Sequence, residues 1–317
     1  MKHLLSIFSS VLISFIILNI LFSLYYNMPI HKEQDNLSTD YVWPGSSVWI
    51  KCTEGISFGK LDKNGYNNLI VTEKPDILLM GSSHMEAMEI FQDQTVASRL
   101  SNKTGLSVYN IGISGHTFPR LINNLDSALN VYNPQKYVIF EISNIDFSDE
   151  IFQEAINHDL QRLTSANKGI IFILQKLPFL RIIYTQLKDA KINKNTIDST
   201  ISTEYAIPDY EKPLSYISKI CKKHNVIPII FLQTPYNFDN NGNITFQTNR
   251  DMLMEFTKNC QENNIIFVNM ENPFKYSFEN KKIFTHGFIT GKVENGHLNK
   301  DGHEIIATTL AKIIEDR

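Results

Sequence analysis

The chain has 317 residues, of which 43% are hydrophobic and 20% charged, the proportions of an ordinary globular protein. Its formal net charge of −3 and pI near 6.3 exclude the strongly basic character of a nucleic-acid-binding protein. The three cysteines (Cys52, Cys221 and Cys260) are widely separated and lack metal-ligand spacing. We therefore predict no metal, no other cofactor and no nucleic-acid partner.

The N-terminal segment has the pattern of a membrane anchor. Leu4 to Tyr26 is an apolar run without a charge, about long enough to span the core of a bilayer. No Ala-x-Ala-like cleavage site follows it, which favours a retained signal anchor over a cleaved signal peptide. Lys2 precedes the run, so the positive-inside rule places the remainder on the periplasmic or extracellular side, although Lys32 just beyond the run weakens this inference. We predict a transmembrane helix within residues 1–28.

Residues 29–72 are polar, with short aromatic patches among Asn, Asp, Gly and Ser. We predict a tether followed by a lead-in segment that packs on the next domain. Trp43 and Trp49 indicate that part of the segment is ordered, because exposed tryptophan is unfavourable in water. The remaining residues, 73–317, suffice for one large α/β domain.

Buried strands and amphipathic helices alternate through this domain, which predicts a flavodoxin-like, doubly wound parallel sheet with right-handed crossovers. The expected strands are Ile77–Met80, Val108–Ile111, Tyr137–Ile142, Val226–Leu232 and Ile265–Asn269. The expected helices are Thr95–Lys103, Pro119–Tyr132, Pro213–His224, Asn249–Asn263 and Glu304–Asp316.

One connection in this domain, residues 149–209, is too long for a simple crossover. Its core, Gly169–Leu187, is apolar enough to need cover. We predict a helical insertion, and the pattern leaves open whether it forms a lid, a membrane-facing surface or a partner site.

A candidate nucleophile follows the first strand of the domain. Gly81-Ser82-Ser83-His84 lies where a buried strand gives way to a helix, so a serine hydroxyl can be exposed there beside backbone N–H groups. Gly-Ser-Ser is also ordinary turn composition, so this motif alone does not establish a catalytic serine.

A candidate base lies at the far end of the chain. Glu294 precedes His297 by three residues, in a loop that enters the last predicted helix, so one short segment could supply both the base and its orienting carboxylate. A serine hydroxyl needs an adjacent imidazole to accept its proton, and the imidazole needs a partner that fixes its tautomer. The carboxyl edge of one parallel sheet would bring Ser83 and His297 together.

Two intermediate segments supply candidate oxyanion donors. A glycine-rich turn containing Gly115 follows the second strand, and Asn144 ends the third. Acyl transfer needs hydrogen-bond donors aimed at a developing oxyanion, each contributing about 3 kcal/mol to lowering the barrier. The backbone N–H groups of Ser83 and Gly115 and the side chain of Asn144 are the candidates.

In chain order, these segments resemble the sequence blocks of the SGNH (GDSL-like) hydrolase superfamily. The blocks are Gly81-Ser82-Ser83, Asn110-x-Gly112-x-x-Gly115, Ser143-Asn144 and Glu294-x-x-His297-Leu298-Asn299. The resemblance spans about residues 75 to 315. Ser82 and Glu294 stand where the family has aspartate, and Ile142 stands where it has glycine.

The resemblance implies that Ser83 is the nucleophile and His297 the general base, with Ser83, Gly115 and Asn144 forming the oxyanion hole. Together with an anchored domain, it implies an esterase or O-acetyltransferase for O-acetyl groups of cell-surface or extracellular polysaccharide. A membrane acyltransferase is then a candidate partner. Two alternatives stay open: a noncatalytic carbohydrate-binding or polysaccharide-assembly component with a degenerate site, and a lipid esterase.

Three further histidines are candidates for the substrate pocket. His84 and His116 each follow a proposed site residue, and His286 lies in a loop before the catalytic segment. Capping or packing for the first two, and simple solvation for the third, are the competing interpretations.

Overall fold

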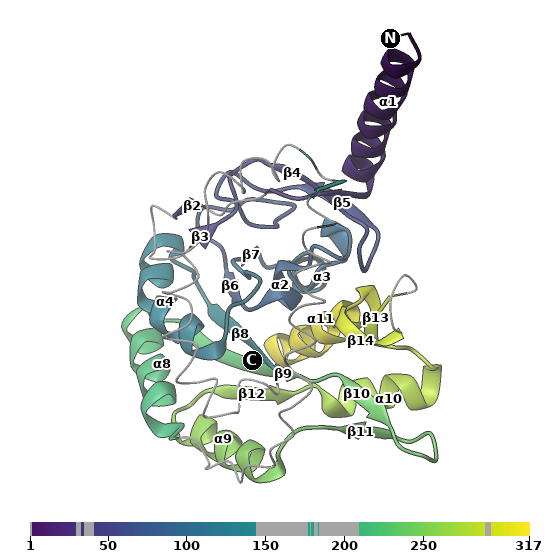
Figure 1. The fold of residues 1–317 in the computed structure, drawn as a ribbon. Coiled ribbons are helices and arrows are strands. Elements are labelled where there is room, and N and C mark those ends of the chain that lie inside the picture. The colour runs from purple at the N-terminus through teal and green to yellow at the C-terminus, as the bar shows by residue number, and fades with distance from the viewer. Residues whose placement is uncertain are drawn as a thin grey trace.

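The computed structural model describes residues 2–29, 33–34, 41–143, 177, 179–180, 183, 209–288 and 293–317 (Figure 1). Asn144 and nearly all of the predicted insertion, 149–209, lie outside the described residues.

A five-stranded parallel sheet forms the centre of the molecule. Its strand order is β12-β9-β8-β6-β7, which is the flavodoxin-like order and confirms the predicted fold class. The strands are almost entirely apolar because helices cover both faces of the sheet. They are β6 (Ile77–Met80), β7 (Val108–Asn110), β8 (Tyr137–Ser143), β9 (Ile227–Gln233) and β12 (Ile266–Asn269).

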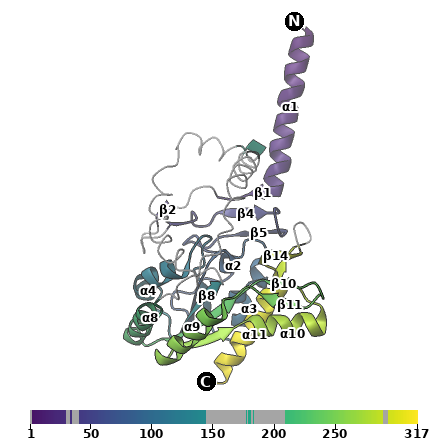
Figure 2. The same cartoon turned by 60° about the horizontal axis from the view of Figure 1, so that its bottom comes forward.

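Helices cover the sheet as two separate layers (Figures 1 and 2). One apolar core lies between the sheet and α4 (Phe118–Tyr132), α8 (Glu211–Lys223) and α9 (Arg250–Glu262). The other lies between the sheet and α3 (Val96–Thr104), α10 (Glu271–Lys281) and α11 (Lys300–Glu315). The five helices predicted by residue range in this domain are all present, with no end shifted by more than four residues, and α10 was not predicted.

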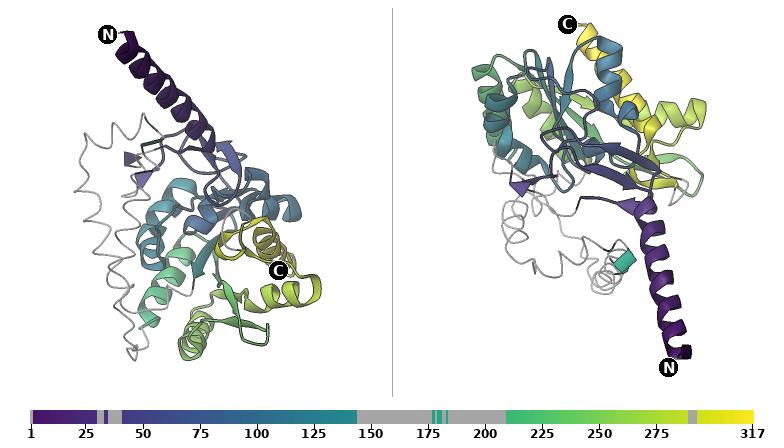
Figure 3. Two further views of the ribbon diagram at one scale, coloured as in Figure 1. Left: turned by 45° about the vertical axis from the view of Figure 1, so that its right-hand side comes forward. Right: turned by 90° about the horizontal axis from the view of Figure 1, so that it is seen from above.

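The chain begins with a helix that projects from the domain. α1 (Lys2–Tyr25) contains an exposed apolar stretch, Leu5–Tyr25, long enough to cross a bilayer or to act as a signal sequence. At its end the chain enters a small antiparallel sheet of β1 (Tyr26–Asn27), β4 (Val48–Lys51) and β5 (Ser57–Lys60). Figures 2 and 3 show this sheet between α1 and the central domain. A two-residue pair, β2 (Glu33–Gln34) and β3 (Tyr41–Val42), lies beside it.

Two hairpins lie outside the central sheet. β10 (Tyr236–Phe238) pairs with β11 (Ile244–Phe246), and β13 (His286–Gly287) pairs with β14 (Val293–Leu298). The second hairpin corrects the expectation that a loop carries His297: the short partner strand β13 holds this segment extended. α2 (Ser83–Glu86) and a 3₁₀ turn (Gln92–Gln94) complete the described elements.

Candidate active site

Ser83 lies at the turn between β6 and α2, where the sequence predicted an exposed hydroxyl. Ser82 caps the short helix, its hydroxyl accepting the backbone N–H of His84 at 3.4 Å. Gly81 is required for close packing, because a Cβ atom there would lie 2.5 Å from Met85 Cγ and 2.8 Å from Glu141 Oε2. The turn is therefore clamped between α2 and β8.

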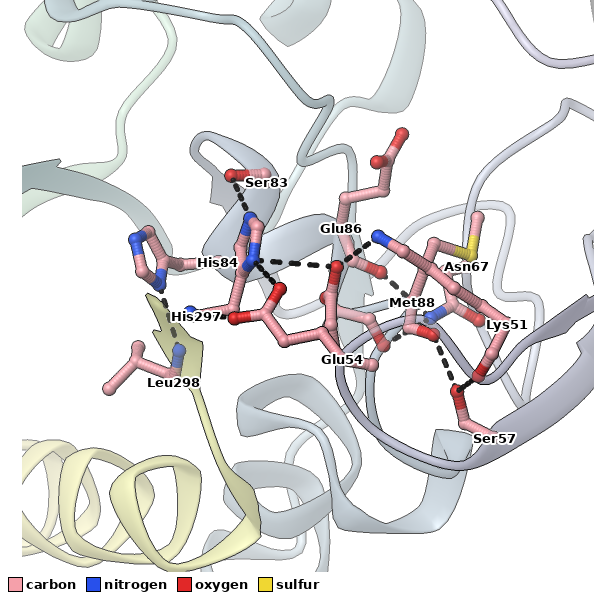
Figure 4. A network of polar contacts seen from close by, with 12 residues as sticks. Lys51, Glu54, Ser57, Asn67, Ser83, His84, Glu86, Met88, His297 and Leu298 are labelled. Atoms are coloured by element: carbon pink, nitrogen blue, oxygen red, sulfur yellow. Dashed lines mark hydrogen bonds and ion pairs between the residues drawn. The ribbon is translucent and has the colours of Figure 1, made fainter. Parts of the chain in front are cut away.

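His297 lies on β14 and contacts Ser83 directly (Figure 4). Its Nε2 is 2.9 Å from Ser83 Oγ, and its Nδ1 is 2.6 Å from Glu54 Oε2. A carboxylate only accepts hydrogen bonds, so Nδ1 carries the proton of the neutral ring and Nε2 is free to accept the serine hydroxyl. This is the arrangement that a serine nucleophile needs.

Glu54 occupies the position on His297 that the sequence analysis gave to Glu294. Its two oxygens bond the ring of His297 and, at 2.7 Å, the backbone N–H of the same residue. Glu294 lies on β14, and its side chain is outside the described part of the structure. We therefore reassign the partner of Nδ1 to Glu54, from the turn between β4 and β5.

Gly296 makes this contact between β14 and the β4–β5 turn possible. It has φ of +108°, a conformation that L side chains rarely adopt. A Cβ atom there would lie 2.1 Å from Glu54 Oε1. Only glycine allows the carboxylate to approach the backbone N–H of His297.

A second carboxylate and a lysine surround the same ring. Glu89 Oε1 lies 3.6 Å from His297 Nδ1, and Lys51 Nζ bonds that same oxygen. Burial lowers the pKa of Lys51, but the charge and hydrogen bond of Glu89, together with the charges of Glu86 and Tyr26, outweigh burial and raise it above its ordinary value. Glu89 is 3% exposed, so its charge is balanced by this ammonium group rather than by water.

These contacts shift the pKa values of His297 and Glu54 in opposite directions. Burial lowers the pKa of His297, but the hydrogen bond that its ring donates to Glu54 and the negative charges of Glu89 and Glu54 together outweigh burial, so the net pKa lies above its ordinary value of 6.5. Burial raises the pKa of Glu54, but the two hydrogen bonds from His297 outweigh burial and lower it. The imidazolium form of His297 is thus stabilised.

Of the three predicted pocket histidines, His84 lies beside His297, and His286 lies beside His84. The His84 and His297 ring centroids are 5.2 Å apart, and those of His84 and His286 are 5.9 Å apart. Burial and the charge of His297 lower the pKa of His84 to about 3, and His84 Nδ1 accepts the backbone N–H of Leu298 at 3.1 Å. His84 therefore supports β14 as a neutral acceptor. His116 is buried, and its backbone N–H bonds Ile113 at the turn after β7.

A series of hydrogen-bonded, buried side chains connects His286 to the turn that carries Ser83. His286 Nε2 lies 3.0 Å from Gln233 Oε1, and Gln233 Nε2 donates to Glu141 Oε1 at 2.9 Å. The other carboxylate oxygen of Glu141 accepts the backbone N–H of Ser82 at 2.7 Å. Burial raises the pKa of Glu141 and lowers that of His286 well below 6.5. This series fixes the backbone next to Ser83.

The predicted oxyanion donors are only partly described. Gly115 lies in the turn after β7 with φ of +90°, and the backbone N–H of Ile113 donates to Gly81 O at 3.0 Å, which ties this turn to the turn that carries Ser83. Asn144 falls immediately after the last described residue of β8. The roles of Gly115 and Asn144 therefore stay predictions.

The sequence analysis missed Lys51, Glu54, Glu89 and Glu141. Glu141 had a visible signal, because a charged residue inside an otherwise apolar central strand is rarely buried without a purpose. Lys51, Glu54 and Glu89 had none, because they lie in segments whose approach to His297 depends on the tertiary fold.

Glu54, Glu89 and His297 also place potential ligand atoms within 4.8 Å of one another, a spacing that a metal ion could use. Lys51 already neutralises Glu89, and His297 Nδ1 donates to Glu54. We interpret the group as a hydrogen-bonded ion-pair cluster.

Comparisons with known proteins bear on the family of the chain. The model of the GDSL-like Lipase/Acylhydrolase family matches residues 77–310. Among solved structures, the psychrotrophic esterase EstA from Pseudoalteromonas sp. is 15% identical, with 76% of this chain and 96% of that chain covered and a TM-score of 0.39. A member of the lipolytic protein G-D-S-L family from Veillonella parvula DSM 2008 is 12% identical, with 75% and 97% covered and a TM-score of 0.41. In the comparison with curated proteins, none matches the chain.

Proposed function

Because the chain belongs to the GDSL-like lipase/acylhydrolase family, a family of esterases and related hydrolases, we propose that it is a serine-dependent acyl-ester hydrolase or acyltransferase. The observation that carries the proposal is the continuous contact from Ser83 through His297 to Glu54. Ser83 is the nucleophile, His297 the general base, and Glu54 the group that orients and stabilises the charged ring.

In the first step, Ser83 Oγ forms a bond with the ester carbonyl carbon while its proton passes to His297 Nε2. The carbonyl π electrons move to oxygen, where the backbone N–H groups of Ser83 and Gly115 and the Asn144 side chain are the proposed donors. Collapse of this intermediate breaks the ester C–O bond, and His297 returns the proton to the leaving alcohol. An acyl-Ser83 intermediate remains.

In the second step, the oxygen of an acceptor hydroxyl forms a bond with the acyl carbon while its proton passes to His297 Nε2. Collapse of this second intermediate breaks the bond between the acyl carbon and Ser83 Oγ, and His297 returns the proton to Ser83. Water as the acceptor gives hydrolysis, and a sugar hydroxyl gives acyl transfer. Both outcomes use the same groups and differ in the exclusion of water from the acyl-enzyme. The charged cluster around His297 serves either outcome.

The proposed substrate class is O-acetyl groups on cell-surface or extracellular polysaccharide. Two features support it: the family to which the chain belongs, and α1, which would hold the domain on the periplasmic or extracellular side of a membrane. A membrane acyltransferase that supplies the acyl group is the proposed partner for the transfer reaction.

Labelling by a fluorophosphonate probe tests the proposed nucleophile. We expect the full chain to be labelled, and Ser83→Ala to lose both labelling and hydrolysis of a chromogenic acetyl ester by at least roughly 10³-fold. Ser82→Ala is the matched control, because its hydroxyl caps α2 and does not contact His297. Full activity in Ser83→Ala would refute the assignment.

The same assay separates the alternatives. A folded chain that is never labelled would favour a noncatalytic binding or assembly component. Faster hydrolysis of long-chain than of acetyl esters would favour a lipid esterase.

A further inference from the structure

We propose that the segment leaving α1, residues Tyr26–Met28, is a positioning element of the active site that holds Glu54 against His297. The inference rests on the proposed function in that Glu54 is taken as the partner of the catalytic base. It gives the membrane-exit segment a role that a simple tether would not have.

The first support is the backbone pairing of this segment. β1 starts directly after the last residue of α1 and pairs antiparallel with β4, with Tyr26 opposite Lys51. The backbone N–H of Cys52 donates to the carbonyl oxygen of Tyr25 at 3.0 Å. The exit segment therefore fixes the chain two residues before Glu54.

The second support is a small apolar cluster that joins the exit segment to both carboxylate-bearing segments. Met28 packs with Trp49, Leu61 and Met88, and its side chain is 6% exposed. Trp49 lies on β4, and Met88 directly precedes Glu89. The cluster thus joins Met28 to the segments that carry Glu54 and Glu89, as a positioning role requires.

The third support is the tight fit between the β4–β5 turn and the segment after α2. A Cβ atom on Gly55 would lie 1.9 Å from the backbone oxygen of Glu89, and Ser57 donates its hydroxyl to the backbone oxygen of Met88. The turn that carries Glu54 therefore cannot shift without moving the segment that carries Glu89. Loosening the cluster under this turn would move both carboxylates relative to His297.

The structural consequence is that the active site lies at the end of α1, and not at the end of a long free tether. Figure 4 shows Lys51 and Glu54 reaching the site from the ribbon of the N-terminal sheet. If the chain were cut before residue 29, β4 would lose β1, one of its two neighbouring strands, and the apolar cluster would lose one of its four buried members.

Substitution of Met28 in the full chain, purified in detergent micelles, tests the proposal. Met28→Asn places an amide in the apolar cluster, Met28→Ala shortens the side chain without adding a polar group, and Met28→Leu conserves the apolar volume. Met254→Asn is the matched control, because Met254 lies on α9 and is 67% exposed. Circular dichroism reports whether each variant is folded.

The decisive readout is the titration of His297, followed by NMR in ¹³C-histidine-labelled protein and assigned by the signal lost in His297→Gln. The titratable or charged groups that face this ring are Glu54 and Lys51 from β4 and its turn, and His84 and Glu89 from α2 and the segment after it. We expect wild type, Met28→Leu and Met254→Asn to titrate above 6.5. Met28→Asn and Met28→Ala should titrate closer to 6.5, with kcat for acetyl-ester hydrolysis reduced roughly 10- to 100-fold and KM little changed.

Wild-type titration of His297 in a folded Met28→Asn variant would overturn the proposal. If that variant does not fold, Met28→Ala decides the question by the same titration. The titration needs no substrate, so it separates this proposal from the proposed function. A chain that hydrolyses no ester yet shows the expected shift would refute the reaction and leave the positioning role intact.

Discussion

His297 combines two properties that a general base needs, an acceptor nitrogen facing Ser83 and a carboxylate on the opposite nitrogen. Its raised pKa means that the ring must lose a proton before it can accept one from the serine. The catalytically competent fraction therefore grows as the pH rises through this pKa, and the acidic limb of the kcat/KM profile should lie above 6.5.

The substitution Glu54→Gln tests two things: the role of the Glu54 carboxylate, and the pH at which the acidic limb of the kcat/KM profile lies. Removing its negative charge should lower the pKa of His297, move the acidic limb to lower pH and reduce kcat by roughly 10²- to 10⁴-fold, since the ring loses its orienting charge. Glu89 remains beside the ring, so some activity should survive.

Glu294→Gln is the matched control for this measurement, which needs only a pH–rate profile of each variant. Glu294→Gln should leave the pH of the acidic limb and the value of kcat close to those of the wild type. The reverse result, a large loss in Glu294→Gln with none in Glu54→Gln, would return the role to the residue predicted from sequence.

Ser83 and His297 could be identified from sequence because each lies in a local motif that ends or begins an element. Glu54 could not, because its partner lies 243 residues away and its own segment shows no motif. Local sequence predicts which side chains can react, whereas the approach of an acid from another part of the chain depends on packing.

At the scale of elements, three parts of the fold meet at the site. Ser83 comes from the β6–α2 junction, Glu54 from the β4–β5 turn, and His297 from the β13–β14 hairpin. The five central strands were predictable because continuous apolar runs of this length indicate buried parallel strands. The two-residue strands β1 and β13 were not, because their conformation comes from pairing with β4 and β14 and not from their own sequence.

Gly296→Ala tests the close approach between β14 and the β4–β5 turn. The added methyl group would collide with Glu54, so we expect a clear loss of kcat and a lower melting temperature. Gly242→Ala is the control, because Gly242 also has positive φ but a Cβ there would meet nothing within 4 Å. It should lower stability modestly and leave the rate unchanged. Equal rates in the two variants would contradict the assigned geometry.

At the scale of the whole molecule, the family match begins at residue 77, whereas Lys51 and Glu54 precede it. The N-terminal segment therefore contributes to the site as well as to the proposed membrane attachment. An apolar N-terminal helix and an ordered lead-in segment were predicted from the sequence, whereas the use of that helix as an anchor stays a prediction. The approach of the lead-in segment to His297 was not predictable, since it depends on how the small sheet docks on the domain.

We propose that the mature protein retains its N-terminus, because β1 directly follows α1 and pairs with β4. We expect the native protein to stay in the membrane fraction after alkaline carbonate washing, and its N-terminal peptide to include residues before Tyr26. Mass spectrometry of the purified protein checks this directly. Recovery of an active protein that starts beyond Met28 would show that β1 is dispensable.

The ionised groups around a neutral His297 ring do not cancel in charge, and this affects turnover. Lys51 offsets one of the carboxylates Glu54 and Glu89, so a neutral ring leaves the group with a surplus negative charge. Proton uptake by the ring cancels the surplus while an oxyanion forms nearby, and deprotonation restores it. Once an ester has been hydrolysed, the free carboxylate product faces a repulsive field, which is expected to hasten its departure and to weaken inhibition by accumulated acid.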